Sequence, residues 1–199
     1  MALDVMLDLE TVGTSASPAI LSVGAYAFDP LGEPTEEPPD DADPCAFYRN
    51  VRLQSCIDLG LLVDGATVMW WLGQGADARR ALFAPDPVPV DNALDMLGRW
   101  FRANFDDQQS YVWSHGATFD VPILEEIYRR LPRRVPWFFS KVHDTRTLFD
   151  LCGYRLPKAD ERPGGHHALG DAWAQAAGVQ WCWREARAAL QARREGVAS

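Results

Sequence analysis

The order of the expected strands and helices is the feature that most restricts what this chain can fold into. Two segments near the N-terminus, Asp4 to Asp8 and Ile20 to Phe28, have the apolar, β-branched and aromatic pattern of strands. The stretch Gly13 to Pro18 between them contains turn-forming residues, so these strands are expected in hairpin order. A third short strand is expected at Phe47 to Leu53.

Helical segments then alternate with short strands. Val90 to Asn104 has apolar residues at spacings of three and four, which predicts a helix with one apolar face. Further strands are expected at Tyr111 to Ser114 and Val142 to Asp144. The remaining helices are expected at Thr67 to Leu82, Thr118 to Leu131, Thr145 to Cys152 and Ala168 to Arg194. This order predicts an α/β fold with a central mixed five-stranded sheet flanked by helices.

Length and composition favour one domain. A chain of 199 residues with 47% hydrophobic residues can bury a full-sized core, so residues 1–199 are expected to form a single domain. The acidic, Pro-rich segment 33–44 is expected to be a solvent-facing loop within it. No apolar run approaches the roughly 20 residues of a membrane span, and Met1 to Glu10 carries acids where a secretory signal would be basic. A cytoplasmic location without a membrane partner is expected.

Charge and cysteine content narrow the function classes. The net charge of −9 argues at first against a polyanionic partner, but residues 33–43 hold six acids and no base, and without them the net charge is −3. Acids that bind metal would also be offset by the bound cations, so the overall charge excludes little. The four cysteines form no C-x-x-C pair, which argues against a zinc site or a disulfide framework.

Acidic residues are spaced as metal ligands would be. Asp8 and Glu10 stand two apart at the end of an expected strand, so both carboxylates point to the same face and repel unless a cation lies between them. Asp120 and Asp171 each lie near the start of an expected helix. Any one of these acids alone is better explained as a polar strand end or as a partner of a helix dipole. Only their combination indicates a site.

The chemistry that such a set supports is phosphodiester hydrolysis. Oxygen-only ligands select hard cations such as Mg²⁺ or Mn²⁺. Two such cations, with a nearby base, activate a water and steady the leaving oxygen. Histidine is the natural base because its ordinary pKa lies near neutral pH.

Three motifs resemble those of a known family. D-L-E-T at Asp8 to Thr11, F-D at Phe119 and Asp120, and H-x-x-x-x-D from His166 to Asp171 look like motifs I, II and III of the DEDDh 3'-5' exonucleases. All three occur in the family's order and together span most of the chain. The small phage and bacterial exonucleases, an exoribonuclease-like group, are the most similar, partly because of W-W-L at Trp70 to Leu72. The resemblance implies a ribonuclease H-like fold.

The resemblance also implies residue roles. Asp8 would bridge two divalent cations, Glu10 and Asp171 would complete the nucleophile-side ion, and Asp120 would act on the leaving-group ion. Glu10 would also lie near the terminal 3' hydroxyl. His166 would deprotonate the attacking water, because only His166 has the family's spacing to Asp171, although the adjacent His167 leaves this assignment open in principle.

Substrate contacts are expected next to these motifs. Thr11 and Val12 would line the terminal nucleotide, with Phe119 beside them. Trp70 and Trp71 point about 100° apart on a helix, so one is expected to pack and the other to face substrate, without an indication of which. The expected substrate is the 3' end of a single-stranded DNA or RNA, released as 5'-monophosphates. Two alternatives remain, a catalytically idle binding member of the fold and a phosphodiesterase for very short oligonucleotides.

Two basic segments could contact other molecules. The run from Arg129 to Arg134 is expected to be a solvated helix end, with downstream phosphate contact as the alternative. The last helix could be a surface helix or a homodimer contact, and the sequence does not decide between them.

Overall fold

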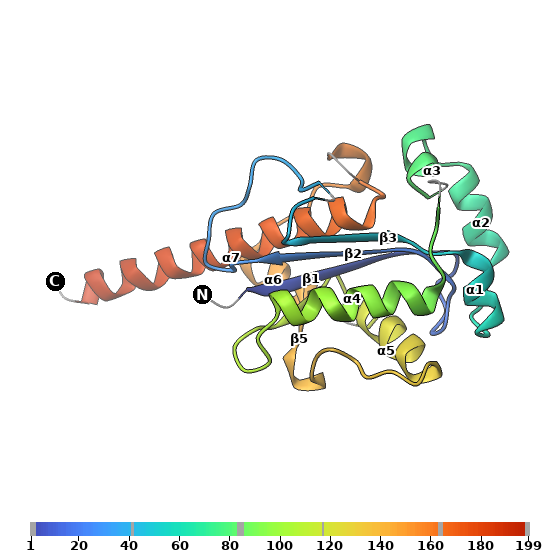
Figure 1. The fold of residues 1–199 in the computed structure, drawn as a ribbon. Coiled ribbons are helices and arrows are strands. Elements are labelled where there is room, and N and C mark those ends of the chain that lie inside the picture. Colours follow the sequence, from blue (N-terminus) through green and yellow to red (C-terminus); the bar gives the residue numbers. More distant parts are fainter. Residues whose placement is uncertain (1–2, 41, 83–85, 117, 163–164, 198–199) are drawn as a thin grey trace.

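The computed structural model describes residues 3–40, 42–82, 86–116, 118–162 and 165–197. Its centre is a five-stranded sheet in the order β3-β2-β1-β4-β5 (Figure 1). The strands are β1 (Asp4–Thr11), β2 (Ile20–Phe28), β3 (Ala46–Asn50), β4 (Val112–Ser114) and β5 (Val142–Asp144). β2 pairs antiparallel with β1 and β3, whereas β4 pairs parallel with β1 and β5. The expected mixed five-stranded sheet is therefore confirmed.

Helices cover both faces of the sheet. α4 (Val90–Asn104) and α5 (Asp120–Arg130) lie on one face, and α6 (Thr145–Cys152) and α7 (Ala168–Val197) lie on the other (Figure 1). Strand alternation explains the two cores: Leu7 of β1 packs in the cluster of α4 and α5, while its neighbour Met6 packs in the cluster of α6 and α7. Side chains at even-numbered positions of β1 therefore face α7.

Smaller elements complete the described fold. α1 (Leu53–Asp58), α2 (Gly65–Leu72) and α3 (Ala76–Leu82) gather at the end of the sheet where β1 ends (Figure 1). Two short 3₁₀ turns, η1 (Phe139–Lys141) and η2 (Ala159–Glu161), precede β5 and α7. Residues 33–40 and 42–44 of the acidic segment contain neither helix nor strand.

β1 runs on to Thr11 instead of ending at Asp8, and two other expected elements differ more widely from the structure. The helix expected from Thr67 to Leu82 is broken between α2 and α3 by Gly73 and Gly75, residues that cost a helix backbone entropy. The strand expected from Phe47 to Leu53 ends at Asn50: the Val51 N–H still donates to Leu21 of β2, but the Arg52 N–H donates to Val88 and the chain then turns into a helix. Leu53 then begins α1, a helix that the sequence pattern did not indicate.

The first half of α7 packs directly on the sheet, and a glycine allows this approach. Gly24 of β2 lies opposite Asp8 of β1, and a Cβ added there would lie 2.2 Å from the carbonyl carbon of Ala168. No side chain fits in that space, so the backbone at the start of α7 rests on β2. This contact brings Asp171 toward Asp8.

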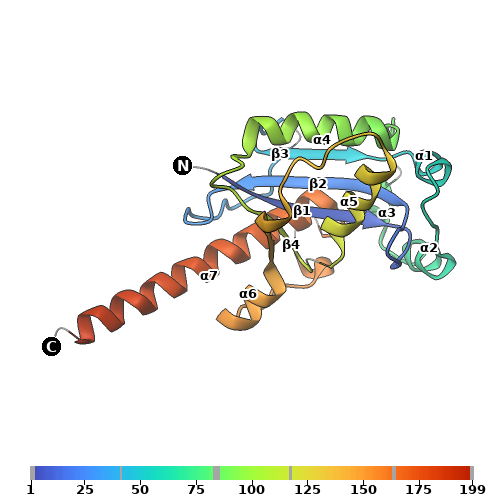
Figure 2. The ribbon, with the colours of Figure 1, turned by 90° about the horizontal axis from the view of Figure 1, so that it is seen from below.

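The second half of α7 leaves the sheet. Both views show its last turns projecting beyond the other elements (Figures 1 and 2). Its side chains from Trp183 to Arg194 are mostly exposed. Within the described ranges, no helix has the length and apolar character required to cross a membrane.

We predict that Gly24→Ala lowers the free energy of unfolding by about 2 to 4 kcal/mol, because the new Cβ overlaps the α7 backbone. Gly65→Ala is the matched control, since nothing lies within 4 Å of a Cβ added there. Urea denaturation of both variants measures the effect. Equal stability of the two variants would show that α7 does not rest on β2 as described.

Candidate active site

Three of the expected acids meet in one place. Asp8 and Glu10 project from β1 toward α7, and Asp171 lies in the first turn of α7. One carboxylate oxygen from each of these residues lies within 4.8 Å of the others. Glu10 and Asp171 are buried and Asp8 is half-buried, so the three carboxyl groups share a site with little exposure to solvent.

Asp120 lies outside this group but is electrostatically coupled to it. It is the first residue of α5, is 5% exposed, and raises the pKa of both Asp8 and Glu10. β4 ends at Ser114, which lies opposite Leu7 of β1. The amide of Leu9, the next one along β1 that faces the β4 side, therefore donates to the Asp120 carboxylate instead of to a strand. The end of β4 thus determines where Asp120 docks.

Burial and mutual repulsion make these acids hard to ionise without a cation. Burial, together with the charges of Asp120, Asp171 and Glu10, raises the pKa of Asp8 well above its ordinary value. Burial and the charges of Asp171 and Asp120 raise the pKa of Glu10 to about 8. Burial also raises the pKa of Asp120 to about 7, against the hydrogen bond from Leu9. A positive charge placed among them would favour the ionised forms.

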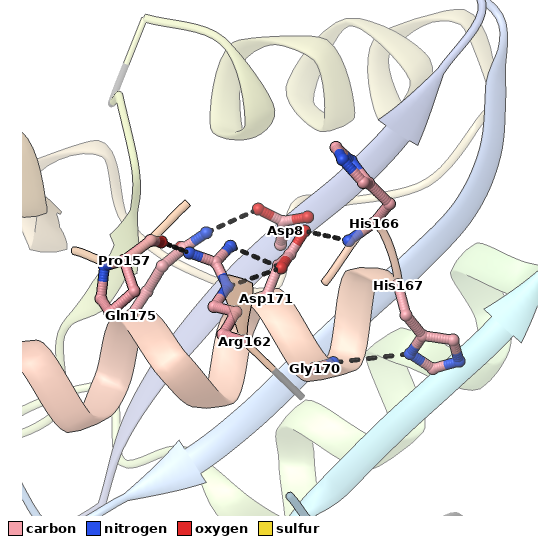
Figure 3. A network of polar contacts seen from close by, with 8 residues as sticks. All are labelled: Asp8, Pro157, Arg162, His166, His167, Gly170, Asp171 and Gln175. Carbon is pink, nitrogen blue, oxygen red and sulfur yellow. Dashed lines mark hydrogen bonds and ion pairs between the residues drawn. The ribbon is translucent and has the colours of Figure 1, made fainter. Parts of the chain in front are cut away.

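Two residues that the sequence reasoning missed contact the acids. The Nε2 of Gln175 donates to Asp8 Oδ1 at 2.8 Å, and Arg162 forms an ion pair with Asp171, with Nη2 2.5 Å from Oδ1 (Figure 3). Gln175 lies one turn beyond Asp171 on α7, a helical spacing that could have suggested it. No spacing rule connects Arg162, which precedes the helix, to Asp171.

Two buried oxygens at the site remain without a hydrogen bond. Glu10 Oε1 and Gln175 Oε1 have no partner among the described residues. Buried polar atoms are normally satisfied, so an oxygen left bare at the centre of an acid cluster is the kind that a cation or its water would satisfy. The donor set of carboxylate oxygens suits a hard divalent cation.

The two adjacent histidines take different directions. His166 has a positive φ of 59°, and its N–H donates to Asp171 Oδ2 at 3.2 Å. Its ring lies edge-on to Trp70, with 5.4 Å between ring centroids, and is directed away from the Asp171 carboxylate (Figure 3). The His167 ring instead stacks on Tyr48, with 4.0 Å between centroids. Of the two, His166 is the imidazole on the side of the tryptophans.

The structure distinguishes the two tryptophans. Trp71 is buried, and its Nε1 donates to the carbonyl of Thr11 at 2.8 Å. Trp70 is 48% exposed and flanks His166. Trp71 therefore packs within the fold, and Trp70 is the exposed member of the pair.

The other expected substrate contacts are largely engaged within the protein. The Thr11 hydroxyl donates to the Gly13 carbonyl at 2.8 Å. Val12 is a core residue, and its N–H donates to the Ala19 carbonyl. Phe119 is partly buried against the same core. These residues shape the end of β1 and the start of α5.

The basic run is engaged in structural contacts. Arg130 pairs with Glu126 and donates to the carbonyls of Leu59 and Gly60. Arg133 forms a two-point ion pair with Asp95. These contacts favour the helix-end interpretation of this run over downstream phosphate contact.

The mixed five-stranded sheet with helices on both faces is that of the ribonuclease H-like fold. The model of the 3'-5' exoribonuclease Rv2179c-like domain family matches residues 3–183, and the chain belongs to that family. The resemblance drawn from the three motifs is confirmed.

Several known proteins are similar to this chain in sequence or in fold. An exodeoxyribonuclease of Enterobacteria phage T4 is 27% identical over 137 residues, which are 65% of this chain and 57% of the phage protein. The nuclease domain of 3'hExo, a DEDDh family member bound to rAMP, has a similar fold, with a TM-score of 0.56, 12% identity and 92% of each chain covered. E. coli Exonuclease I in complex with a dT13 oligonucleotide gives a TM-score of 0.57 at 14% identity, with 91% of this chain and 41% of that chain covered.

We predict that the cation-free protein loses stability as the pH rises from about 4.5, near the ordinary pKa of these acids, to about 8. The folded state holds protons on Glu10, with a pKa of about 8, and on Asp120, with a pKa of about 7, that the unfolded chain has already released. Raising the pH removes those protons and leaves uncompensated charge in the fold. Thermal unfolding in EDTA measures the loss.

The control for this prediction is Glu10→Gln, which carries no charge at this position. Its Tm should fall less than that of the wild type over the same pH range. Added Mn²⁺ should raise the wild-type Tm more at high pH than at low pH. A Tm that is independent of pH in EDTA would contradict the electrostatic account.

Proposed function

We propose that this chain is a 3'-5' exonuclease that hydrolyses phosphodiester bonds at the 3' end of single-stranded nucleic acid and releases nucleoside 5'-monophosphates. The observation that carries the proposal is the meeting of Asp8, Glu10 and Asp171 oxygens within 4.8 Å, with Asp120 coupled to them. The name of the family and the activity in the name of the phage T4 relative support it. Solved proteins of this fold have been seen with rAMP and with dT13, ligands of the proposed kind.

We propose two divalent cations, Mg²⁺ or Mn²⁺, as cofactors. Asp8 would contact both, Glu10 and Asp171 would hold one, and Asp120 would act on the other. When bound, such cations offset phosphate charge, lower the pKa of water and steady a leaving oxygen. The bare Glu10 Oε1 and the all-oxygen donor set support this assignment.

The chain's own residues would divide the remaining work. His166 would take the proton of the attacking water, because its backbone is tied to Asp171 while its ring lies beside Trp70. Trp70 would stack on a terminal base, which requires no particular base because every base has a flat face. Glu10 would lie near the 3' hydroxyl, and Thr11, Val12 and Phe119 would shape the pocket for the terminal nucleotide.

A second candidate substrate is a very short oligonucleotide. A cavity of about 540 Å³ is lined by Gln74, Arg162 and His166, among others, and the last two contact Asp171. Its volume lies within the range of small-molecule sites. Arg130 and Arg133, which could otherwise bind a longer chain, are paired with Glu126 and Asp95. Hydrolysis of oligonucleotides of increasing length would distinguish the two substrates.

We predict that 5'-labelled single-stranded DNA or RNA is shortened from its 3' end to a descending ladder in Mg²⁺ or Mn²⁺ and stays intact in EDTA. Asp8→Asn should abolish the ladder, since it removes a charge from the centre of the cluster. Parallel time courses on DNA and RNA of equal sequence would establish which sugar is preferred. An intact substrate with every metal would favour the idle binding alternative.

We predict that His166→Ala lowers kcat by about 10²- to 10⁴-fold while cation affinity stays near that of the wild type, because a general base is lost and no ligand is. His167→Phe is the control, since an aromatic ring can still stack on Tyr48. Steady-state rates and Mn²⁺ titration measure both variants. If His167→Phe alone were inactive, the proton acceptor would be the other imidazole.

A further inference from the structure

The strongest charged contact at the site is the ion pair between Arg162 and Asp171. Both side chains are only 10% exposed, and Nε and Nη2 of Arg162 lie 3.2 and 2.5 Å from Asp171 Oδ1. The third guanidinium nitrogen, Nη1, donates to the Pro157 carbonyl at 2.5 Å (Figure 3). One edge of the guanidinium therefore donates to a carboxylate of the candidate cation site.

This position conflicts with cation binding. Asp171 Oδ1 accepts both Arg162 contacts, which occupy its two lone-pair directions, and Oδ2 accepts the His166 N–H, which leaves one direction open. A divalent cation on Asp171 would also meet the positive guanidinium at close range and be repelled. A cation and the guanidinium therefore compete for the same carboxylate.

A released guanidinium has a defined place to go. Arg162 and His166 both line the cavity of about 540 Å³. Guanidinium groups bind phosphate through two parallel hydrogen bonds, as they bind carboxylate. An acid cluster that must accept a phosphate benefits from a cationic side chain turned toward it.

We propose that Arg162 is a substrate-binding residue that exchanges partners: it neutralises Asp171 until a cation takes that carboxylate, and then binds a phosphate of the nucleotide in the adjoining cavity. The proposal rests on the proposed function, because it requires a cation at Asp171 and a nucleotide beside it. It also differs from a purely structural role, in which Arg162 would hold Asp171 in place for the cation.

The two roles predict opposite effects on cation affinity. Titration of the full chain with Mn²⁺ alone, followed by calorimetry, compares the wild type with Arg162→Met, which keeps much of the side chain's length without its charge. Under the exchange, Arg162→Met binds Mn²⁺ about tenfold more tightly, since a competing charge is gone. Under the structural role, it binds Mn²⁺ more weakly or equally, and this result overturns the proposal.

Nucleotide binding is the second readout. With Mn²⁺ saturating, adenosine 5'-monophosphate should bind Arg162→Met about tenfold more weakly than the wild type, because the charge-assisted phosphate contact is lost. Arg162→Lys keeps the charge but loses the two-point geometry, so it should fall between them in both titrations. If Arg162→Met binds the nucleotide as tightly as the wild type, Arg162 does not contact the phosphate, and the proposed exchange of partners is wrong.

Arg155→Met is the matched control. It removes the same charge from an exposed position in the same segment between α6 and α7, and should leave both affinities within about twofold of the wild type. Thermal unfolding verifies that each variant is folded. If the wild type itself binds no Mn²⁺, the proposed function fails, whereas wild-type binding without tightening in Arg162→Met is a failure of the exchange alone.

Discussion

Mutual repulsion among buried carboxylates is the constraint on which the rest of this structure depends. Asp8, Glu10 and Asp171 present oxygens within 4.8 Å of one another, an arrangement that is costly without compensating charge. The fold supplies a separate partner to each of two acids, an amide from Gln175 for Asp8 and a guanidinium from Arg162 for Asp171. Glu10 keeps an oxygen without a partner, so the compensation is incomplete. The incomplete part is what a bound cation would compensate.

Bringing the acids together requires close contact between secondary structure elements. Asp171 belongs to α7 and Asp8 to β1, and these elements approach because Gly24 leaves room for the α7 backbone on β2. The early end of β4 has a similar effect on the other side, since it leaves the Leu9 amide for Asp120. The site therefore depends on the absence of a side chain at Gly24 and on the early end of β4 as well as on the acids.

Much of this arrangement could be predicted where the sequence has a periodic apolar pattern or a local motif. The bounds of α4, β2 and α6 follow from apolar spacing and turn residues, and the motifs identified the acids that meet. The pattern could not reveal the break at Gly73 and Gly75, because glycine is tolerated within helices and only tertiary packing decides whether it ends one. Arg162 was missed for a related reason: its contact with Asp171 depends on how the segment before α7 folds back, which no spacing encodes.

In two pairs of adjacent residues the sequence did not show which member has the functional role, and the backbone conformation directs the two side chains differently. Trp70 and Trp71 diverge because adjacent residues of α2 point in different directions, so one indole is held by Thr11 and the other remains exposed. His166 and His167 diverge because His166 adopts a left-handed φ of 59°, a conformation that costs energy for a residue other than glycine. Its N–H reaches Asp171 in that conformation, so the hydrogen bond offsets part of the cost. The acid that would hold a cation thereby also fixes the backbone of the imidazole proposed to act beside it.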